Sequence, residues 1–198
     1  FASWKFPATI FLLAIFSLIF RLLLNNSDWK ERSLLKWFIV ASVGLRLLAI
    51  FAYFPIATYM GWTASWNTLD IPAYEVPVLF GDGADAILYS RAKATFWRGF
   101  WIPTSDLFEV FNPERSFVGI HGDVRHLLPQ TIIFFLFGVE PVAARVLSAM
   151  LAVLSALLAF TILRDNFGKQ AAWIGISLIS FWPTLLIWSL DALKEPYY

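Results

Sequence analysis

Apolar residues along the chain fall into four blocks of close to 20, separated by segments rich in polar residues. A helix of about 20 apolar residues matches the ~30 Å hydrocarbon core of a bilayer. The blocks therefore predict four transmembrane helices, at Phe6–Leu24, Trp37–Phe54, Val142–Leu163 and Ala171–Leu190. This pattern favours an all-α integral membrane protein over a soluble domain with a large core.

The polar segments differ in length and charge. Two are short and basic, Asn25–Lys36 and Arg164–Lys169, whereas Pro55–Arg125 holds eight acidic and five basic residues. Short loops rich in Lys and Arg stay in the cytoplasm, so the long acidic loop is expected outside. It is expected to contain short helices lying in the membrane interface. The apolar segment His126–Phe137 is too short to cross and predicts a juxtamembrane or re-entrant helix.

These boundaries predict two regions. Residues 1–36 form an N-terminal span and a cytoplasmic loop, and residues 37–198 form a membrane module whose extracytoplasmic loop covers residues 55–125. A cleaved signal peptide is the alternative for the first span, but its apolar run is longer than a typical signal sequence. The expected location is the bacterial inner or plasma membrane.

Composition narrows the function classes. Hydrophobic residues make up 59% of the 198 residues, and charged residues make up 15%, against about 25% in soluble domains. The absence of cysteine excludes disulfides, thiolate metal sites and cysteine nucleophiles. A net charge of +1 without a basic, aromatic-rich tract gives no indication of nucleic-acid binding. Sequence motifs for nucleotide-phosphate loops, zinc peptidases and serine hydrolases are also absent.

Two aspartates in the long loop are the main catalytic candidates. Asp82 and Asp85 lie in GDGADAILYSRAKA, where glycines permit a sharp turn before a helix. One alternative is simple capping of that helix by a carboxylate. The other is general-base catalysis, in which the carboxylate deprotonates an acceptor hydroxyl as it attacks a sugar.

Basic residues nearby are candidate substrate ligands. Arg91, Lys93 and Arg98 follow on the same predicted helix and would bind the phosphate of a lipid-linked donor. The alternative is that they extend into the interface as ordinary solvated cations. Arg46 lies in the middle of the second span, where an arginine is costly, so it either extends toward the surface or faces a polar cavity or an acidic partner.

Further polar residues occur in two other segments. His121 and His126 flank Asp123 and are candidates for binding substrate phosphate. A divalent metal is an alternative, although their spacing matches no specific metal template. Asp191 and Glu195 follow the fourth span, on the membrane face predicted for Asp82 and Asp85. They are candidates for a second catalytic acid, or are ordinary charges at a helix end.

The order of spans and polar landmarks resembles the GT-C superfamily of membrane glycosyltransferases. Protein O-mannosyltransferases and lipid A aminoarabinose transferases are the most similar members. The resemblance covers residues 34–195 and rests on the segments GLRLL, GDGADAILYSRA, FGVEPVAARVLSAMLAVLSALLAFTILRDNFGKQAAW and WPTLLIWSLDALKEP. It implies transfer of a sugar from a polyprenyl-phosphate donor to an acceptor on the extracytoplasmic side.

The resemblance also implies roles for single residues. Asp85 or Asp82 would match the catalytic carboxylate of the first loop, and Asp191 or Glu195 the acid of the second loop. Members of the superfamily have many more spans, so the chain matches only their N-terminal portion. The alternative is a non-catalytic transmembrane subunit, a shortened relative that packs among membrane lipids in a larger complex. A transporter is disfavoured because the chain contains no paired repeats.

Overall fold

The computed structural model describes the helical bundle and parts of the long loop. The described residues are 6–25, 31–61, 63–64, 76–77, 86–87, 90–91, 93–95, 97–98 and 128–190. Helices account for nearly all of them, as the apolar blocks predict. The exception is a pair of two-residue antiparallel strands, β1 (Thr63–Ala64) and β2 (Val76–Pro77), which the sequence did not indicate.

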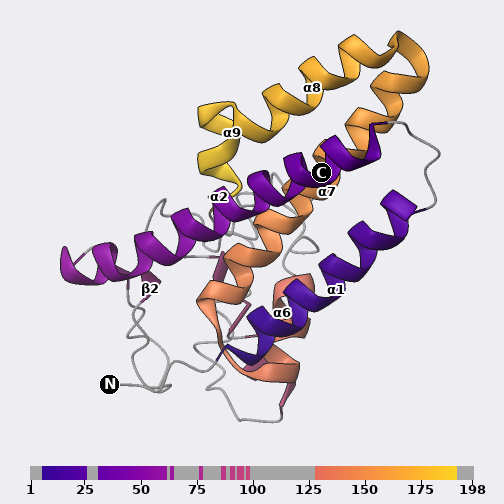
Figure 1. Ribbon diagram of the computed structural model, residues 1–198. Coiled ribbons are helices and arrows are strands. Elements are labelled where there is room, and N and C mark those ends of the chain that lie inside the picture. Colours follow the sequence, from indigo (N-terminus) through magenta and orange to yellow (C-terminus); the bar gives the residue numbers. More distant parts are fainter. Residues whose placement is uncertain are drawn as a thin grey trace, which may run out of the picture.

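Helix α7 (Pro141–Phe167) is the centre of the bundle. Helices α1 (Pro7–Asn25), α2 (Arg32–Tyr59), α6 (Leu128–Phe137) and α8 (Lys169–Phe181) all pack against it, as Figure 1 shows. The first ten residues of α7 are buried all round, which requires neighbours on every side. Alanine is frequent there, so adjacent helices approach the α7 backbone closely.

Helices α1 and α2 each bury one stripe of side chains. On α1 the stripe recurs every four residues from Ala8 to Leu24, and on α2 every three or four residues from Leu35 to Ala57. Residues at these spacings lie on one face of a helix, so each stripe faces the bundle. The opposite faces are apolar and exposed, for example at Ile10.

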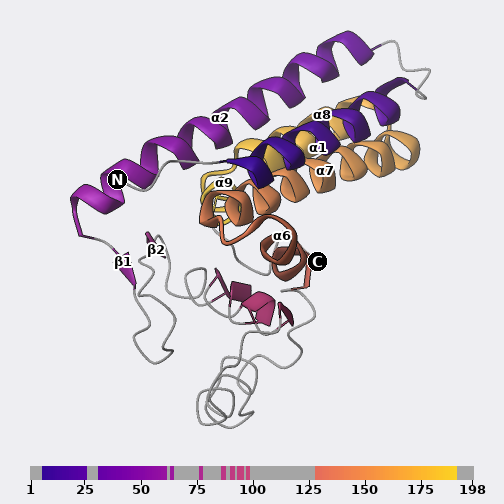
Figure 2. The ribbon, with the colours of Figure 1, turned by 90° about the horizontal axis from the view of Figure 1, so that it is seen from below.

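Contacts at the helix ends set the directions of the helices. Glu140 at the start of α7 contacts the start of α1, so these two helices run parallel. Glu31, just before α2, pairs with Arg164 in the last turn of α7 and with Lys169 in the first turn of α8. Helices α2 and α8 therefore both run opposite to α7. Figure 2 shows these four helices lying together, with α6 on one side of them.

Within the described residues, three helices are long and apolar enough to cross a membrane: α1, α2 and α7. Two are longer than the sequence indicated. Helix α2 includes Pro55 and extends five residues beyond the predicted end at Phe54, and α7 continues to Phe167. The predicted inner turn after α7 is consequently only Gly168, whose φ of 85° suits glycine.

The fourth predicted span is interrupted. It consists of α8, with 13 residues, and α9 (Pro183–Trp188), with six, separated at Trp182. Pro183 lacks an N–H and cannot continue the α8 hydrogen-bond ladder, so the break follows from the sequence. The described part of α8 is about 20 Å long at 1.5 Å per residue, which is short of the ~30 Å hydrocarbon core.

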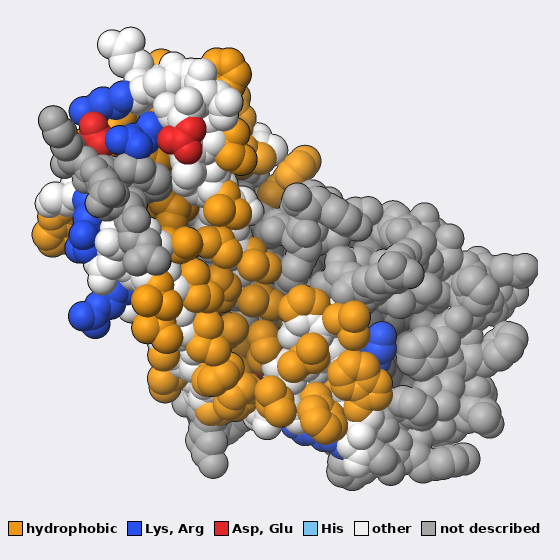
Figure 3. Space-filling model, turned by 90° about the vertical axis from the view of Figure 1, so that its right-hand side faces the viewer, with side chains coloured by type: hydrophobic (Ala, Val, Ile, Leu, Met, Phe, Trp, Pro, Cys, Tyr) orange, Lys and Arg blue, Asp and Glu red, His pale blue; other side chains and the backbone are white. Residues whose placement is uncertain are grey.

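The surface agrees with a membrane environment. Figure 3 shows a broad hydrophobic face with Lys and Arg side chains at its margins. In the described residues, α1, α2 and α8 all expose large hydrophobic side chains that a soluble protein would bury. The described part of the chain is therefore built as a membrane-embedded helical bundle.

Candidate functional site

Most of the predicted catalytic and substrate residues lie outside the described part of the chain. These residues are Asp82, Asp85, His121, His126, Asp191 and Glu195. Four predicted substrate ligands are described: Arg46, Arg91, Lys93 and Arg98. Their surroundings, together with the buried charges of α7, define the candidate site.

Arg98 binds the carboxyl end of α6. Its Nη2 donates hydrogen bonds to the carbonyl oxygens of Phe134 (2.7 Å) and Phe135 (2.6 Å), and its Nε donates to Phe135 O (3.0 Å). The last carbonyls of a helix have no partner within it, and a cation there interacts favourably with the helix dipole. Arg98 therefore has a structural contact that competes with the predicted role in phosphate binding.

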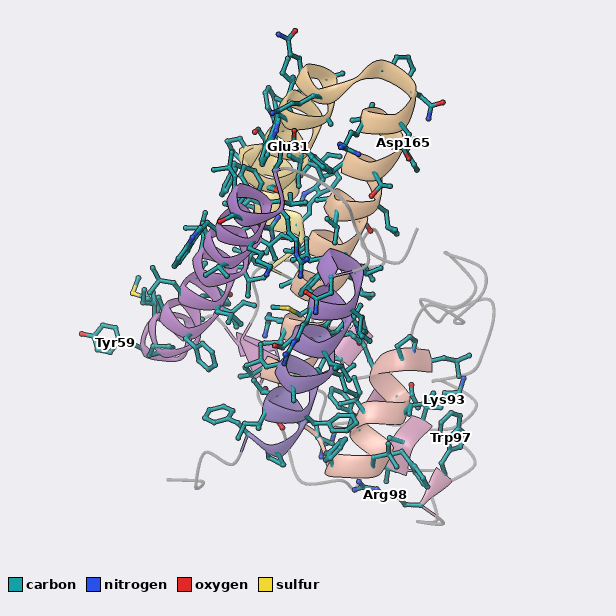
Figure 4. The ribbon with its side chains drawn as sticks, turned by 45° about the vertical axis from the view of Figure 1, so that its right-hand side comes forward. Glu31, Tyr59, Lys93, Trp97, Arg98 and Asp165 are labelled. Carbon is teal, nitrogen blue, oxygen red and sulfur yellow. The ribbon has the colours of Figure 1, made fainter. Side chains whose placement is uncertain are left out.

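Lys93 and Trp97 lie along α6, and Arg98 lies at its carboxyl end, as Figure 4 shows. The Lys93 ammonium is 5.6 Å from the centre of the Trp97 ring, and that ring packs edge-on against Phe135. The contact with Lys93 is of cation–π type. Trp97 is exposed, which suits an aromatic residue at the membrane interface.

The same loop segment is attached to α6 by a buried polar contact. Ser90 Oγ donates to Gln130 Oε1 at 3.3 Å, and both side chains are fully buried. Arg91, the next residue, is half-buried and helical. The segment that carries Arg91, Lys93 and Arg98 is thus attached to α6 at Ser90 and at Arg98, and Figure 4 shows Lys93 and Arg98 at the opposite end of the bundle from Glu31 and Asp165.

Arg46 is separate from this group, in the interior of the bundle. It is 1% exposed and lies fourteen residues after Arg32 and thirteen before Tyr59, at the midpoint of α2. Its Nε donates to Ser189 Oγ (2.9 Å), and its Nη1 donates to Ser42 O (3.2 Å) and Oγ (2.5 Å). Arg46 is therefore buried and does not extend to the surface, whereas a polar cavity or an acidic partner beside it stays a prediction.

The contact with Ser189 changes the predicted path of the chain. The sequence places the end of the fourth span at the outer surface. Ser189 instead lies beside the middle of α2, because α9 turns away from the line of α8 (Figure 1). The Ser189 hydroxyl also donates to Leu186 O at 2.7 Å, so it joins Arg46 to the end of α9.

A second buried arginine, Arg145 of α7, was not among the predicted site residues. It is 1% exposed, and its guanidinium lies 5.8 Å from the ring centre of Tyr53 on α2. Tyr53 follows Arg46 by seven residues, or two helical turns, so both face the bundle interior. The sequence placed Arg145 near a helix end, where a cation is ordinary; only the packing of α7 shows that it is enclosed.

Glu140, another residue that the sequence did not single out, joins α1 to α7. Its Oε2 accepts from Ala8 N (3.0 Å), and its Oε1 accepts from Thr9 N (3.1 Å) and from the Thr9 hydroxyl. The carboxylate is 7% exposed and satisfies free N–H groups at the start of α1. A negative charge is favourable there because it opposes the positive end of the helix dipole.

Glu31 forms a charged cluster at the other end of the bundle. Its Oε1 lies 2.8 Å from Lys169 Nζ, and its Oε2 lies 3.7 Å from Arg164 Nη2. The hydrogen bond from Lys169 is the main cause that lowers the pKa of the Glu31 carboxyl below its ordinary value. This cluster fixes the ends of three helices and is far from the candidate site (Figure 4).

A metal centre has no support in the described part of the chain. There, no group of three or more acidic or histidine side chains could hold a metal ion. The two histidines and the adjoining aspartate of the long loop lie outside the described residues, so the metal alternative stays a hypothesis.

Comparisons with protein-family models, with curated proteins and with solved structures find no match to the chain.

Proposed function

We propose that the chain is the membrane module of a glycosyltransferase that uses a polyprenyl-phosphate-linked sugar. The observation that carries this proposal is the pair of buried arginines, Arg46 and Arg145, in the interior of an apolar bundle. Ionisable residues inside a membrane are costly and mark functional sites. Their positions fall in segments that resemble the GT-C superfamily, which gives the buried charge a functional context.

In this proposal the sugar donor is bound beside α6. The donor phosphate would be bound by Arg91 or Lys93, and Arg98 on the same segment donates from Nε and Nη2 to the carbonyls of α6. A phosphate held there would gain charge-assisted hydrogen bonds from either cation. Asp85 or Asp82 would act as the general base. Because Ser189 lies beside the middle of α2, a role for Asp191 or Glu195 as a second acid requires the chain to return to the outer face after residue 190.

The proposed sidedness follows from charge. The end of the bundle that carries Arg164 and Lys169 would face the cytoplasm, since short basic loops remain there. The opposite end, with α6, would then face the extracytoplasmic side of a bacterial inner or plasma membrane. Donor and acceptor would meet on that side.

The test is sugar transfer in membranes that contain the full-length protein. A panel of polyprenyl-phosphate sugars is supplied, and release of the polyprenyl phosphate is measured for the wild type and for the double variant Asp82→Asn with Asp85→Asn. Loss of turnover, on the order of 10²-fold or more, is expected when a general base is removed. Asp165→Asn, at the other end of the bundle, is the matched control. Undiminished turnover in the double variant would refute the proposed catalytic role.

A second candidate function has one observation in its favour. The break between α8 and α9 is surrounded by exposed side chains, among them Trp182, Thr184 and Leu185. Irregular backbone at membrane depth requires cover by protein or a water-filled cavity. A non-catalytic transmembrane subunit in a larger complex would obtain that cover from its partners. Native mass spectrometry of mildly extracted protein tests this function: a complex of fixed stoichiometry without donor turnover would support it.

A further inference from the structure

Arg46 has hydrogen-bonding capacity that the described residues do not use. A guanidinium carries five N–H groups, and those on Nε and Nη1 meet Ser189 and Ser42. No described residue accepts a hydrogen bond from Nη2 of Arg46. Both serine partners are neutral, so nothing among the described residues offsets the positive charge.

The depth of Arg46 makes this arrangement costly. At 1.5 Å per residue it lies about 21 Å along α2 from Arg32, and the whole helix is about 42 Å long. A hydrocarbon core of ~30 Å centred on α2 therefore encloses the guanidinium far from either interface. A cation at that depth is favourable only if it pairs with an anion or contacts water.

We propose that Arg46 binds a carboxylate at mid-membrane depth. The two N–H groups of Nη2, together with its positive charge, match a carboxylate oxygen, which accepts strong charge-assisted hydrogen bonds. The phosphate of an ordinary bilayer lipid fits less well, since it lies at the interface, about 15 Å from the midplane of a 30 Å core. The inference stands whether or not the chain transfers a sugar.

Acids in the described part of the chain are not available for this pairing. Glu140 accepts three hydrogen bonds from the start of α1, and Glu31 pairs with Lys169. Asp165 lies at the far end of α7 from Glu140. The carboxylate therefore comes from elsewhere.

Two sources supply the same chemistry. One is the chain itself, in which Asp191, outside the described residues, follows Ser189 by two positions in the sequence. The other is an acidic residue on a transmembrane helix of a second protein, which would also cover the exposed break between α8 and α9. The experiment below separates the sources.

Cross-linking identifies the carboxylate directly. The chain has no cysteine, and its lysines are few, so an amine introduced by Arg46→Lys is a distinctive site. A hydrophobic carbodiimide, added to native membranes, joins such an amine to a carboxylate in contact with it. Mass spectrometry is expected to find an amide at position 46. An amide to the peptide containing residue 191 assigns the chain itself, and an amide to another protein assigns a partner helix. Absence of any amide at position 46 overturns the proposal.

Thermal stability in native membranes gives an independent measurement. Arg46→Met preserves much of the volume but would leave the carboxylate buried and unpaired, so the melting temperature is expected to fall on the order of 10 °C. Ser189→Ala removes the charge-assisted hydrogen bond from Arg46 and the hydrogen bond to Leu186 O but keeps the charge, so its melting temperature should fall less than that of Arg46→Met. If no carboxylate is bound, Arg46→Met removes an unpaired buried cation. A melting temperature that is unchanged or raised would therefore also overturn the proposal.

Discussion

The contact of Glu140 with α1 yields a quantitative prediction. Glu140→Gln keeps the shape of the side chain but replaces one carboxylate oxygen by an amide NH₂. If the amide oxygen faces Thr9, the NH₂ faces the N–H of Ala8, and two donors oppose each other. The variant loses one charge-assisted hydrogen bond, leaves a buried N–H without an acceptor and removes a charge from the helix terminus.

The expected loss in free energy of unfolding is about 3 kcal/mol, since a hydrogen bond to a charged group contributes about 1.5–3 kcal/mol and the helix-end charge up to about 1 kcal/mol. For a chain of this size, 1 kcal/mol shifts the melting temperature by about 2–4 °C, so a fall of about 6–12 °C is expected. Thr9→Val removes the hydroxyl but keeps both backbone donors, and should cost about 1.5 kcal/mol, the lower end of the range for a hydrogen bond to a charged group.

The assay is thermal unfolding of the purified protein in detergent, followed by circular dichroism. Amide hydrogen exchange at Ala8 and Thr9 adds a local measurement, because both N–H groups depend on Glu140. Asp165→Asn is the control for charge removal at an exposed site. If Glu140→Gln lowers the melting temperature no more than this control, and exchange at Ala8 is unchanged, the proposed link between α1 and α7 is refuted.

Three further predictions concern helix packing, helix capping and pH. A Cβ at Gly175 would overlap Cδ1 of Leu163, so Gly175→Leu should lower the free energy of unfolding by about 1–3 kcal/mol. Gly175→Ala should change it by no more than about 1 kcal/mol, because the Leu163 side chain can rotate and alanine has the better helix propensity. Thermal unfolding of the two variants distinguishes these outcomes. Arg98→Gln should increase amide hydrogen exchange in the last turn of α6 and lower the free energy of unfolding by about 1 kcal/mol. Arg98→Lys should recover part of that free energy because it restores a cation at the helix end. Amide protection in Arg98→Gln equal to that of the wild type would contradict the capping role. The pKa of Glu31 is lowered in the folded state, so its ion pair with Lys169 stabilises that state at pH values above the ordinary pKa of 4.5. This stabilisation is lost as the pH falls through the lower, folded-state pKa, and Glu31→Gln should therefore remove that part of the pH dependence of the melting temperature. Identical pH profiles for the wild type and the variant would contradict the stabilising role of the ion pair.

Several features followed from the sequence alone. Runs of mostly apolar residues specified the three long helices, because a helix satisfies all the backbone polar groups of such a segment in lipid. Pro183 specified the interruption of the fourth span. The mid-span position of Arg46 marked it as an unusual cation but left extension to the surface and burial both open.

Other features depended on the tertiary structure. Glu140 looked like an ordinary residue before a helix, and Arg145 like a cation near a helix end; their burial results from the packing of α1, α2 and α6 around α7. Arg98 looked like a phosphate ligand, and only its proximity to the end of α6 shows the capping contact. Periodicity along one helix determines which face is apolar, but it carries no information about which distant segment covers that face. For this reason the sequence could predict the long helices, whereas the burial of Arg46 and the partners of each charged group were decided by how the helices pack.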